Sequence, residues 1–152
     1  MSRSMAFLHL SDLHLAPPGQ RVVGIDPMRQ MRSVLARMAR LAEAPAFIVV
    51  SGDLTENGSA ASYAVVNEVL IELGGGGTPL LVALGNHDDR AAFRRVVLGE
   101  KRADDQGPYC YSRLIDGLRV IVLDSTIPGH PSGSVDAAQQ AWLEEELQLP
   151  AP

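Results

Sequence analysis

The segment from Ala46 to Gly58, AFIVVSGDLTENG, places five consecutive apolar residues directly before a cluster of polar and turn-forming residues. A short run that is apolar throughout is typical of a strand covered on both faces. Strands are also expected at residues 5–10 and 80–84, and longer segments with helical periodicity separate the three. This alternation predicts an α/β fold with a largely parallel sheet, in which the strands at 46–50 and 80–84 are central.

Four helices are expected to flank this sheet. In the first, residues 28–42, apolar residues recur at helical spacing, and Asp26-Pro27 provides a cap followed by proline in the first turn. We interpret this apolar stripe as core packing and the arginines between its members as a solvated face. The other helices are expected at 60–73, from Asp88 or Asp89 onward, and at about 135–147. The stripe consists of Met28, Met31, Leu35, Met38 and Ala42.

Two further strands, at 109–115 and 118–124, are predicted to form a hairpin, because Asp116-Gly117 between them is a strong two-residue turn signal. Cys110 is expected to be a small buried hydrophobic residue in the first of these strands. His9, in the first strand of the chain, is expected to pack in the core. The charged segment 100–106 is interpreted as a solvated surface loop.

The composition limits the classes of protein to consider. A length of 152 residues, with 46% apolar and 20% charged residues, indicates one soluble globular domain over residues 1–152. The net charge of −5 supplies no basic field for a phosphate backbone, which argues against a nucleic-acid partner. The longest purely apolar runs have five residues, whereas a transmembrane helix needs about 20. No export signal is recognisable, and the single cysteine fits a reducing compartment, so we expect a cytoplasmic protein.

Polar motifs follow each of the first three predicted strands. They are Ser11-Asp12-Leu13-His14, the segment Ser51 to Gly58, and Gly85-Asn86-His87-Asp88. The carboxyl ends of parallel strands meet at one edge of a sheet, where α/β proteins commonly build their sites. We therefore expect the three motifs to converge.

The residue types in these motifs suit a metal centre. Asp12 and His14 are two positions apart in an extended segment, so they can offer a carboxylate oxygen and an imidazole nitrogen to one ion. Asp53 can use its two oxygens for different cations, and Asn86 can donate an amide oxygen. His87 would then act as a proton donor or phosphate contact. An aspartate after a strand is often only a turn former or helix cap, but three such motifs in order favour the metal-centre interpretation.

The motifs resemble those of the calcineurin-like metallophosphoesterases, whose series Asp-x-His, Gly-Asp and Gly-Asn-His-Asp is matched at residues 12–14, 52–53 and 85–88. The resemblance covers essentially the whole chain. Within that superfamily the sequence looks most like the bacterial class III cyclic-nucleotide phosphodiesterases, on the basis of these motifs together with three nearer the C-terminus. The three are Leu123-Asp124-Ser125, Pro128-Gly129-His130 and Gln140-Ala141-Trp142-Leu143.

The resemblance implies an αββα sandwich of two mixed sheets flanked by helices, of which this chain would form the N-terminal portion. It implies two metal ions of manganese, iron or zinc, with Asp12, His14 and Asp53 on the first and Asp53 and Asn86 on the second. His87 would assist the reacting phosphoryl group, and Asp88 would orient His87 or cap the next helix. Two cations neutralise a phosphodiester and acidify a bridging water, so a metal-bound hydroxide could attack phosphorus. The expected function is a metal-dependent phosphoesterase for a small-molecule phosphodiester, with cyclic AMP as a candidate.

The family pattern also contains a later isolated histidine and a Gly-His-x-His motif, which are absent from residues 1–152. His9 and His130 remain as spare histidines, and neither lies where the pattern places a ligand. We therefore expect a weak second metal site and a domain truncated at its C-terminus. An uncovered apolar sheet face would favour a homo-oligomer or a complementary half.

Alternative functions remain open at this point. The chain could be a catalytically impaired fragment that binds a metal or a partner. Within the enzyme class, the alternative substrates are glycerophosphodiesters, phosphoproteins and nucleic acids. The acidic net charge makes nucleic acids the least compatible of these.

Overall fold

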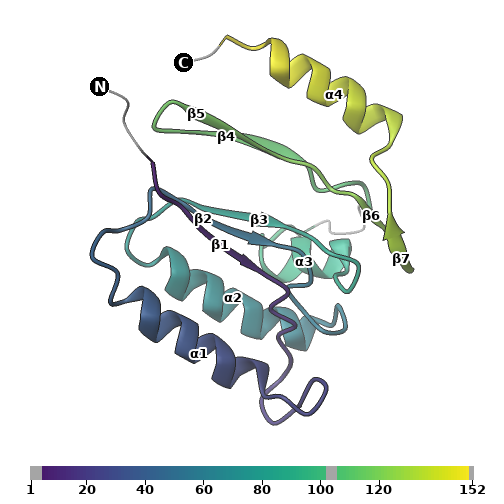
Figure 1. Ribbon diagram of the computed structural model, residues 1–152. Helices are drawn as coiled ribbons and strands as arrows, with labels where there is room; N and C mark the ends of the chain where they lie inside the picture. The colour runs from purple at the N-terminus through teal and green to yellow at the C-terminus, as the bar shows by residue number, and fades with distance from the viewer. Residues whose placement is uncertain (1–4, 102–105, 151–152) are drawn as a thin grey trace.

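The computed structural model describes residues 5–101 and 106–150. In chain order, its elements are β1 (Leu8–Ser11), α1 (Pro27–Met38), β2 (Ile48–Ser51), α2 (Ala60–Gly74), β3 (Leu80–Ala83), α3 (Arg90–Val96), β4 (Tyr111–Ile115), β5 (Leu118–Val122), β6 (Thr126–Ile127), β7 (His130–Gly133) and α4 (Ala137–Gln148). Helices α1 and α2 cover one face of the sheet formed by β1, β2 and β3 (Figure 1). The β4–β5 hairpin lies over the other face, and α4 lies outside the hairpin. This layer order confirms the α/β prediction.

The three-stranded sheet is parallel, with the order β1-β2-β3. Ser11 pairs with Ser51, and Ser51 pairs with Ala83, so the three strands end at the same level. The prediction that the strand at 80–84 is central is wrong for the sheet that the described residues form, where β3 is an edge strand and β2 alone has a strand on each side. The continuous apolar sequence of β3 instead reflects coverage of both its faces: Val82 joins the helix-side core and Leu81 the hairpin-side core.

The core beneath the sheet confirms the interpretation of the methionine stripe. Met31 is fully enclosed, and Met28, Leu35 and Met38 pack against the same cluster. Asp26 caps α1 by accepting a hydrogen bond from the backbone of Arg29, and Pro27 occupies the first turn, as predicted.

Helix α1 ends earlier than the periodicity predicts, at Met38 rather than residue 42. Beyond that point the chain tightens into i to i+3 bonds, from Arg40 N–H to the Arg37 carbonyl and from Leu41 N–H to the Met38 carbonyl. Ala42 is exposed as a result and does not extend the apolar face.

The β4–β5 hairpin forms the second sheet layer. Asp116 and Gly117 have φ values of 48° and 88°, the left-handed conformations that a type I′ turn requires, so the predicted turn is confirmed. Tyr111 fastens the hairpin to the outer edge of β3. Its hydroxyl accepts a hydrogen bond from Val82 N–H at 2.8 Å and donates one to the Val82 carbonyl at 2.9 Å. One side chain thereby satisfies the backbone groups of Val82 that face away from β2.

A buried ion pair joins α3 to the segment after β5. Arg90 Nε lies 2.9 Å from Asp124 Oδ2. Burial opposes ionisation of Asp124, but hydrogen bonds from Thr126 and Tyr109, with Arg90, hold its pKa below the ordinary value. Gln139 of α4 pairs with both backbone groups of Asp124. This network ties the hairpin layer to the helix that directly follows the Gly-Asn-His-Asp motif.

Other predictions require correction. His9 is exposed rather than packed in the core, because the hairpin-side cluster forms over β2 and β3 and includes no residue of β1. Cys110 is half-buried and precedes β4. His130 opens β7, which pairs with β6 in a short hairpin that the neighbouring prolines obscure in the sequence. The predicted loop at 100–106 lies largely outside the described residues.

Within the described ranges, no helix combines the length and the apolar character needed to cross a bilayer.

Candidate metal centre

The three predicted motifs meet at the carboxyl edge of the parallel sheet. The loops after β1 and β2 continue to pair beyond the strands, with Asp12 N–H donating to the Gly52 carbonyl at 3.2 Å and His14 N–H donating to the Asp53 carbonyl at 2.8 Å. The loop after β3 reaches the same place, since His87 N–H donates to Asp53 Oδ1 at 3.0 Å. Backbone bonds therefore hold the candidate side chains in place.

Asp12, His14 and Asp53 have left-handed backbones, with φ values of 55°, 43° and 45°. This region is uncommon for residues other than glycine. Such conformations cost of order 1–3 kcal/mol each and cluster at functional sites, where the surrounding structure enforces them. These three residues also carry the side chains that suit a metal ion, so the strained backbone and the ligand chemistry indicate the same site.

The side chains of Asp12, His14 and Asp53 offer ligand atoms that all lie within 4.8 Å of one another. His14 Nε2 is 3.6 Å from Asp53 Oδ2. Two carboxylates and one imidazole are a donor set that suits manganese, iron and zinc. The donor chemistry and spacing therefore fit a divalent cation, and these three residues could hold it.

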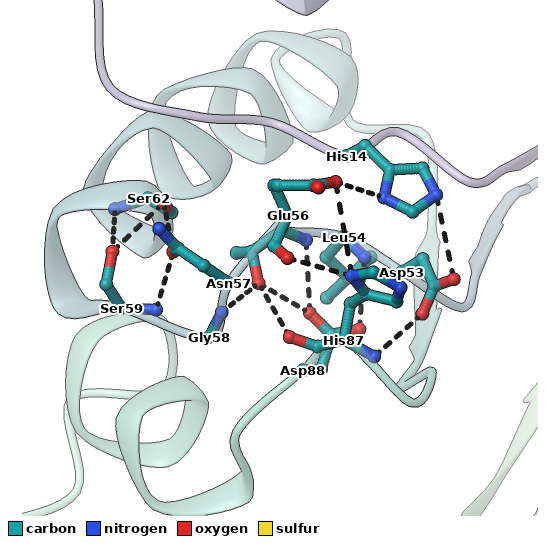
Figure 2. Close-up of polar contacts among 11 residues, drawn as sticks. His14, Asp53, Leu54, Glu56, Asn57, Gly58, Ser59, Ser62, His87 and Asp88 are labelled. Carbon is teal, nitrogen blue, oxygen red and sulfur yellow. Dashed lines mark hydrogen bonds and ion pairs between the residues drawn. The ribbon is translucent and has the colours of Figure 1, made fainter. Parts of the chain in front are cut away.

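His87 lies beside this group. Its Nδ1 is 2.8 Å from the Glu56 carbonyl oxygen, and its ring meets the His14 ring edge-on with 4.9 Å between centroids (Figure 2). The hydrogen bond to Glu56 is the main cause of a raised pKa for His87, and partial burial opposes it. With the Nδ1 proton donated to the carbonyl, Nε2 is the nitrogen left for proton transfer.

Asp88 connects the loops that carry the site. Its Oδ2 accepts hydrogen bonds from Gly85 N–H at 2.9 Å and Leu54 N–H at 3.0 Å. Its Oδ1 accepts from both the backbone and the hydroxyl of Thr55 at 3.1 Å, and from the Tyr63 hydroxyl at 3.0 Å. Burial raises the pKa of Asp88, and the bonds to Gly85, Leu54 and Thr55 oppose that rise.

These contacts change the expected role of Asp88. The helix cap is Asp89, which accepts from Ala92 N–H at 2.7 Å, so Asp88 does not cap α3. The hydrogen bonds of the Asp88 carboxylate go to the loop after β2 and to α2 rather than to the His87 ring. Asp88 therefore positions the His87 loop as a whole by tying it to its neighbours.

Replacing Tyr63 with phenylalanine is expected to lower the free energy of unfolding by about 1–3 kcal/mol. The fully buried Tyr63 hydroxyl donates to Asp88 and accepts from Asp89 N–H at 3.0 Å, so both partners would lose a hydrogen bond inside the protein. Urea unfolding measures the change. The matched control is Tyr109→Phe, whose hydroxyl makes no hydrogen bond among the described residues, and an equal loss in both variants would contradict this reasoning.

Asn86 lies in the loop after β3, between Gly85 and His87. Its side chain is exposed. Both of its neighbours lie close to the Asp53 carboxylate, because an added Cβ at Gly85 would clash with Asp53 Oδ1 and His87 N–H donates to the same oxygen. Its role as a ligand of a second ion stays a prediction.

Glu56 is part of the site although the sequence pattern gave it no role. Its carboxylate lies 2.9 Å from His14 Nδ1, and its ligand atoms group with those of His14 and His87. Its acidic character and its position three residues after Asp53 are visible in the sequence. Its contact with His14 joins segments 42 residues apart, which the pattern does not reveal.

Comparison with known proteins agrees with this geometry. The model of the calcineurin-like phosphoesterase family matches residues 5–147. The chain is 38% identical to a probable cyclic nucleotide phosphodiesterase of Rhodococcus erythropolis, covering 95% of this chain and 48% of that protein. It is 39% identical to a cAMP/cGMP dual specificity phosphodiesterase of Mycobacterium tuberculosis, over 95% of this chain and 46% of that protein. It is 32% identical to a glycerophosphodiester phosphodiesterase of Enterobacter lignolyticus, over 94% of this chain and 51% of that protein.

The chain thus spans about half the length of the curated relatives it matches. The family match extends over nearly all of the described residues and includes the three motifs that converge at the sheet edge. The chain therefore belongs to the calcineurin-like phosphoesterase family.

Proposed function

We propose that this chain provides the metal-binding portion of a metal-dependent phosphodiesterase. The observation that carries the proposal is the convergence of Asp12, His14 and Asp53 within 4.8 Å of one another, with His87 beside them. Metal-assisted hydrolysis of a phosphoester needs side chains that bind a cation and, next to them, a group that can transfer a proton. Here the first three residues could bind the cation, and His87 Nε2 could transfer the proton.

Each residue has a defined task in this proposal. Asp12, His14 and Asp53 would hold one cation, and Asp53 and Asn86 would hold a second. When bound, the cations supply charge neutralisation for the phosphodiester and acidify the water that attacks phosphorus. His87 would donate a proton to the departing alkoxide through Nε2, because its Nδ1 is engaged by the Glu56 carbonyl.

The proposed substrate is a small-molecule phosphodiester, with cyclic AMP as the first candidate and a glycerophosphodiester as the second. Relatives named for each of these activities match the chain over more than nine-tenths of its length. A cavity of about 350 Å³ lies beside Asp12 and His14 and is lined largely by apolar side chains, including Val22 and Val34. Its size and lining suit the organic part of a small ester.

A second candidate function is a metal-binding or partner-binding fragment with little activity of its own. One observation favours it: the chain spans about half the length of the relatives that it matches. Phe7, directly before β1, is 55% exposed and stacks on the buried Phe47. Such a surface would suit a complementary half or a second copy of the chain.

Hydrolysis measurements distinguish the two candidates. Bis(p-nitrophenyl) phosphate and cyclic AMP would be incubated with excess Mn²⁺ and either this chain or a fusion of it to the C-terminal half of the Rhodococcus relative. We expect the fusion to be at least about 100-fold faster, because electrostatic stabilisation by a complete metal centre is worth several kcal/mol.

The control is the fusion carrying His14→Ala, which should lose the gain in rate. Equal turnover by the chain alone and by the fusion would show that the C-terminal half adds no needed metal ligand. His130 or a second copy of the chain would then supply the remaining ligands. A fusion that binds Mn²⁺ but hydrolyses neither ester would favour the second candidate.

A further inference from the structure

We propose that Glu56 is a positioning residue that fixes the tautomer of His14 and so directs its Nε2 atom toward the metal. This inference rests on the proposed function, because it assigns His14 to a metal. It adds a residue that the family motifs do not mark and gives that residue a physical task.

The two nitrogens of His14 face different partners. Nδ1 is 2.9 Å from Glu56 Oε2, and Nε2 is 3.6 Å from Asp53 Oδ2 (Figure 2). The first distance is that of a hydrogen bond, and the second leaves room for a cation between ring and carboxylate. The ring therefore has a protein-facing nitrogen and a site-facing nitrogen.

These two different partners favour one tautomer of the His14 ring. A neutral ring carries one N–H and one lone pair, and an ionised carboxylate can only accept a hydrogen bond. Glu56 therefore stabilises the form in which Nδ1 carries the proton and Nε2 carries the lone pair. This tautomer prepares His14 for metal binding before an ion arrives.

Glu56 is itself held from two sides. Its backbone N–H donates to the Leu15 carbonyl at 3.1 Å, and its carbonyl accepts from His87 Nδ1 at 2.8 Å. One residue therefore connects the loop carrying His14 with the loop carrying His87. The side chain is 36% exposed, so the fold does not depend on it in the way it depends on a core residue.

A direct ligand role is the alternative for Glu56. Its carboxylate groups with His14 and His87 within 4.8 Å, which is close enough for a shared ion. His14 Nδ1, however, is hydrogen-bonded to this carboxylate, and His14 Nε2 faces Asp53 instead. The carboxylate is 4.0 Å from His87 Nδ1, which bonds to the Glu56 carbonyl. These contacts favour a role for Glu56 in orienting His14 over a role as a metal ligand.

The test uses the metal-free chain labelled with ¹⁵N at histidine, studied by long-range ¹H–¹⁵N NMR at about pH 8, where an ordinary imidazole is neutral. We expect His14 to be protonated at Nδ1 in the unmodified chain and to shift toward the Nε2-protonated form in Glu56→Ala. Glu56→Gln should retain the Nδ1 form, because its amide oxygen can accept the same bond. The exposed Glu68→Ala serves as the matched control and should leave the spectrum unchanged.

Calorimetric titration with Mn²⁺ completes the experiment. Glu56→Ala should bind about 10–100-fold more weakly, the usual cost of losing a partner of a ligating histidine, and Glu56→Gln should recover part of that loss. An unchanged His14 tautomer in Glu56→Ala would overturn the proposal. Equal loss of affinity in the alanine and glutamine variants would also overturn it, in favour of a direct ligand. Failure of the unmodified chain to bind Mn²⁺ would contradict the proposed function, while the metal-free spectrum tests Glu56 separately.

Discussion

Asp53→Ala is expected to lower Mn²⁺ affinity by more than about 100-fold and to remove binding more completely than His14→Ala. Loss of a partner in the outer shell already costs about 10–100-fold, and loss of a ligand should cost more. The two oxygens of Asp53 face different neighbours, since Oδ2 faces His14 and Oδ1 faces the His87 backbone. A carboxylate placed in this way can serve two cations, whereas His14 can serve only one. Calorimetric titration measures both affinities.

Two further variants make the comparison specific. Asp53→Asn preserves the volume and can still accept from His87 N–H, so it separates loss of charge from loss of the loop contact. His130→Ala should leave Mn²⁺ binding unchanged, because His130 is exposed in β7 and belongs to neither candidate group of metal ligands among the described residues. Equal residual affinity in Asp53→Ala and His14→Ala would count against a bridging role for Asp53.

Gly85→Ala is expected to lower the free energy of unfolding by about 3 kcal/mol or more, the upper end of what overpacking costs. A Cβ at this position would lie 2.2 Å from the Asp53 backbone nitrogen and 2.3 Å from its Oδ1. The backbone of the loop after β2 would have to move, which would also displace the Asp53 carboxylate. Mn²⁺ binding should therefore weaken together with stability, and urea unfolding and calorimetry measure the two effects.

The matched control for this substitution is Gly74→Ala. Gly74 lies in the last turn of α2, and an added Cβ there has no atom within 4 Å. Alanine has the higher helix propensity, so this variant should be neutral or slightly stabilised. A Gly85→Ala protein as stable as Gly74→Ala, with unchanged Mn²⁺ affinity, would show that the two loops are not tightly packed.

The sequence predicted the features that depend on periodicity and on strand order. Alternating strands and helices implied a parallel sheet, and parallel strands bring their carboxyl ends to one edge. The convergence of Asp12, His14 and Asp53 follows from this rule. The hairpin turn at Asp116-Gly117 was similarly local, because two adjacent residues specify it.

The features that the sequence missed depend on contacts between distant segments. The role of Asp88 arises from donors 25 to 34 residues away and from Gly85. Glu56 contacts His14 although 42 residues separate them in the sequence. The exposed position of His9 depends on how far the hairpin extends over the sheet. These three features do not follow from apolar periodicity. Periodicity indicates which faces of an element are buried, but it does not indicate which polar groups come into contact.

Anomalous diffraction from crystals of this chain grown with Zn²⁺ would show whether Asp12, His14 and Asp53 form a cation site. We expect a zinc peak about 2.0–2.2 Å from His14 Nε2 and from carboxylate oxygens of Asp12 and Asp53. Glu56 should remain hydrogen-bonded to His14 Nδ1 in the same crystals. A peak bound instead by His14 Nδ1, Glu56 and His87, or no peak at the edge of the sheet, would contradict a cation site formed by Asp12, His14 and Asp53.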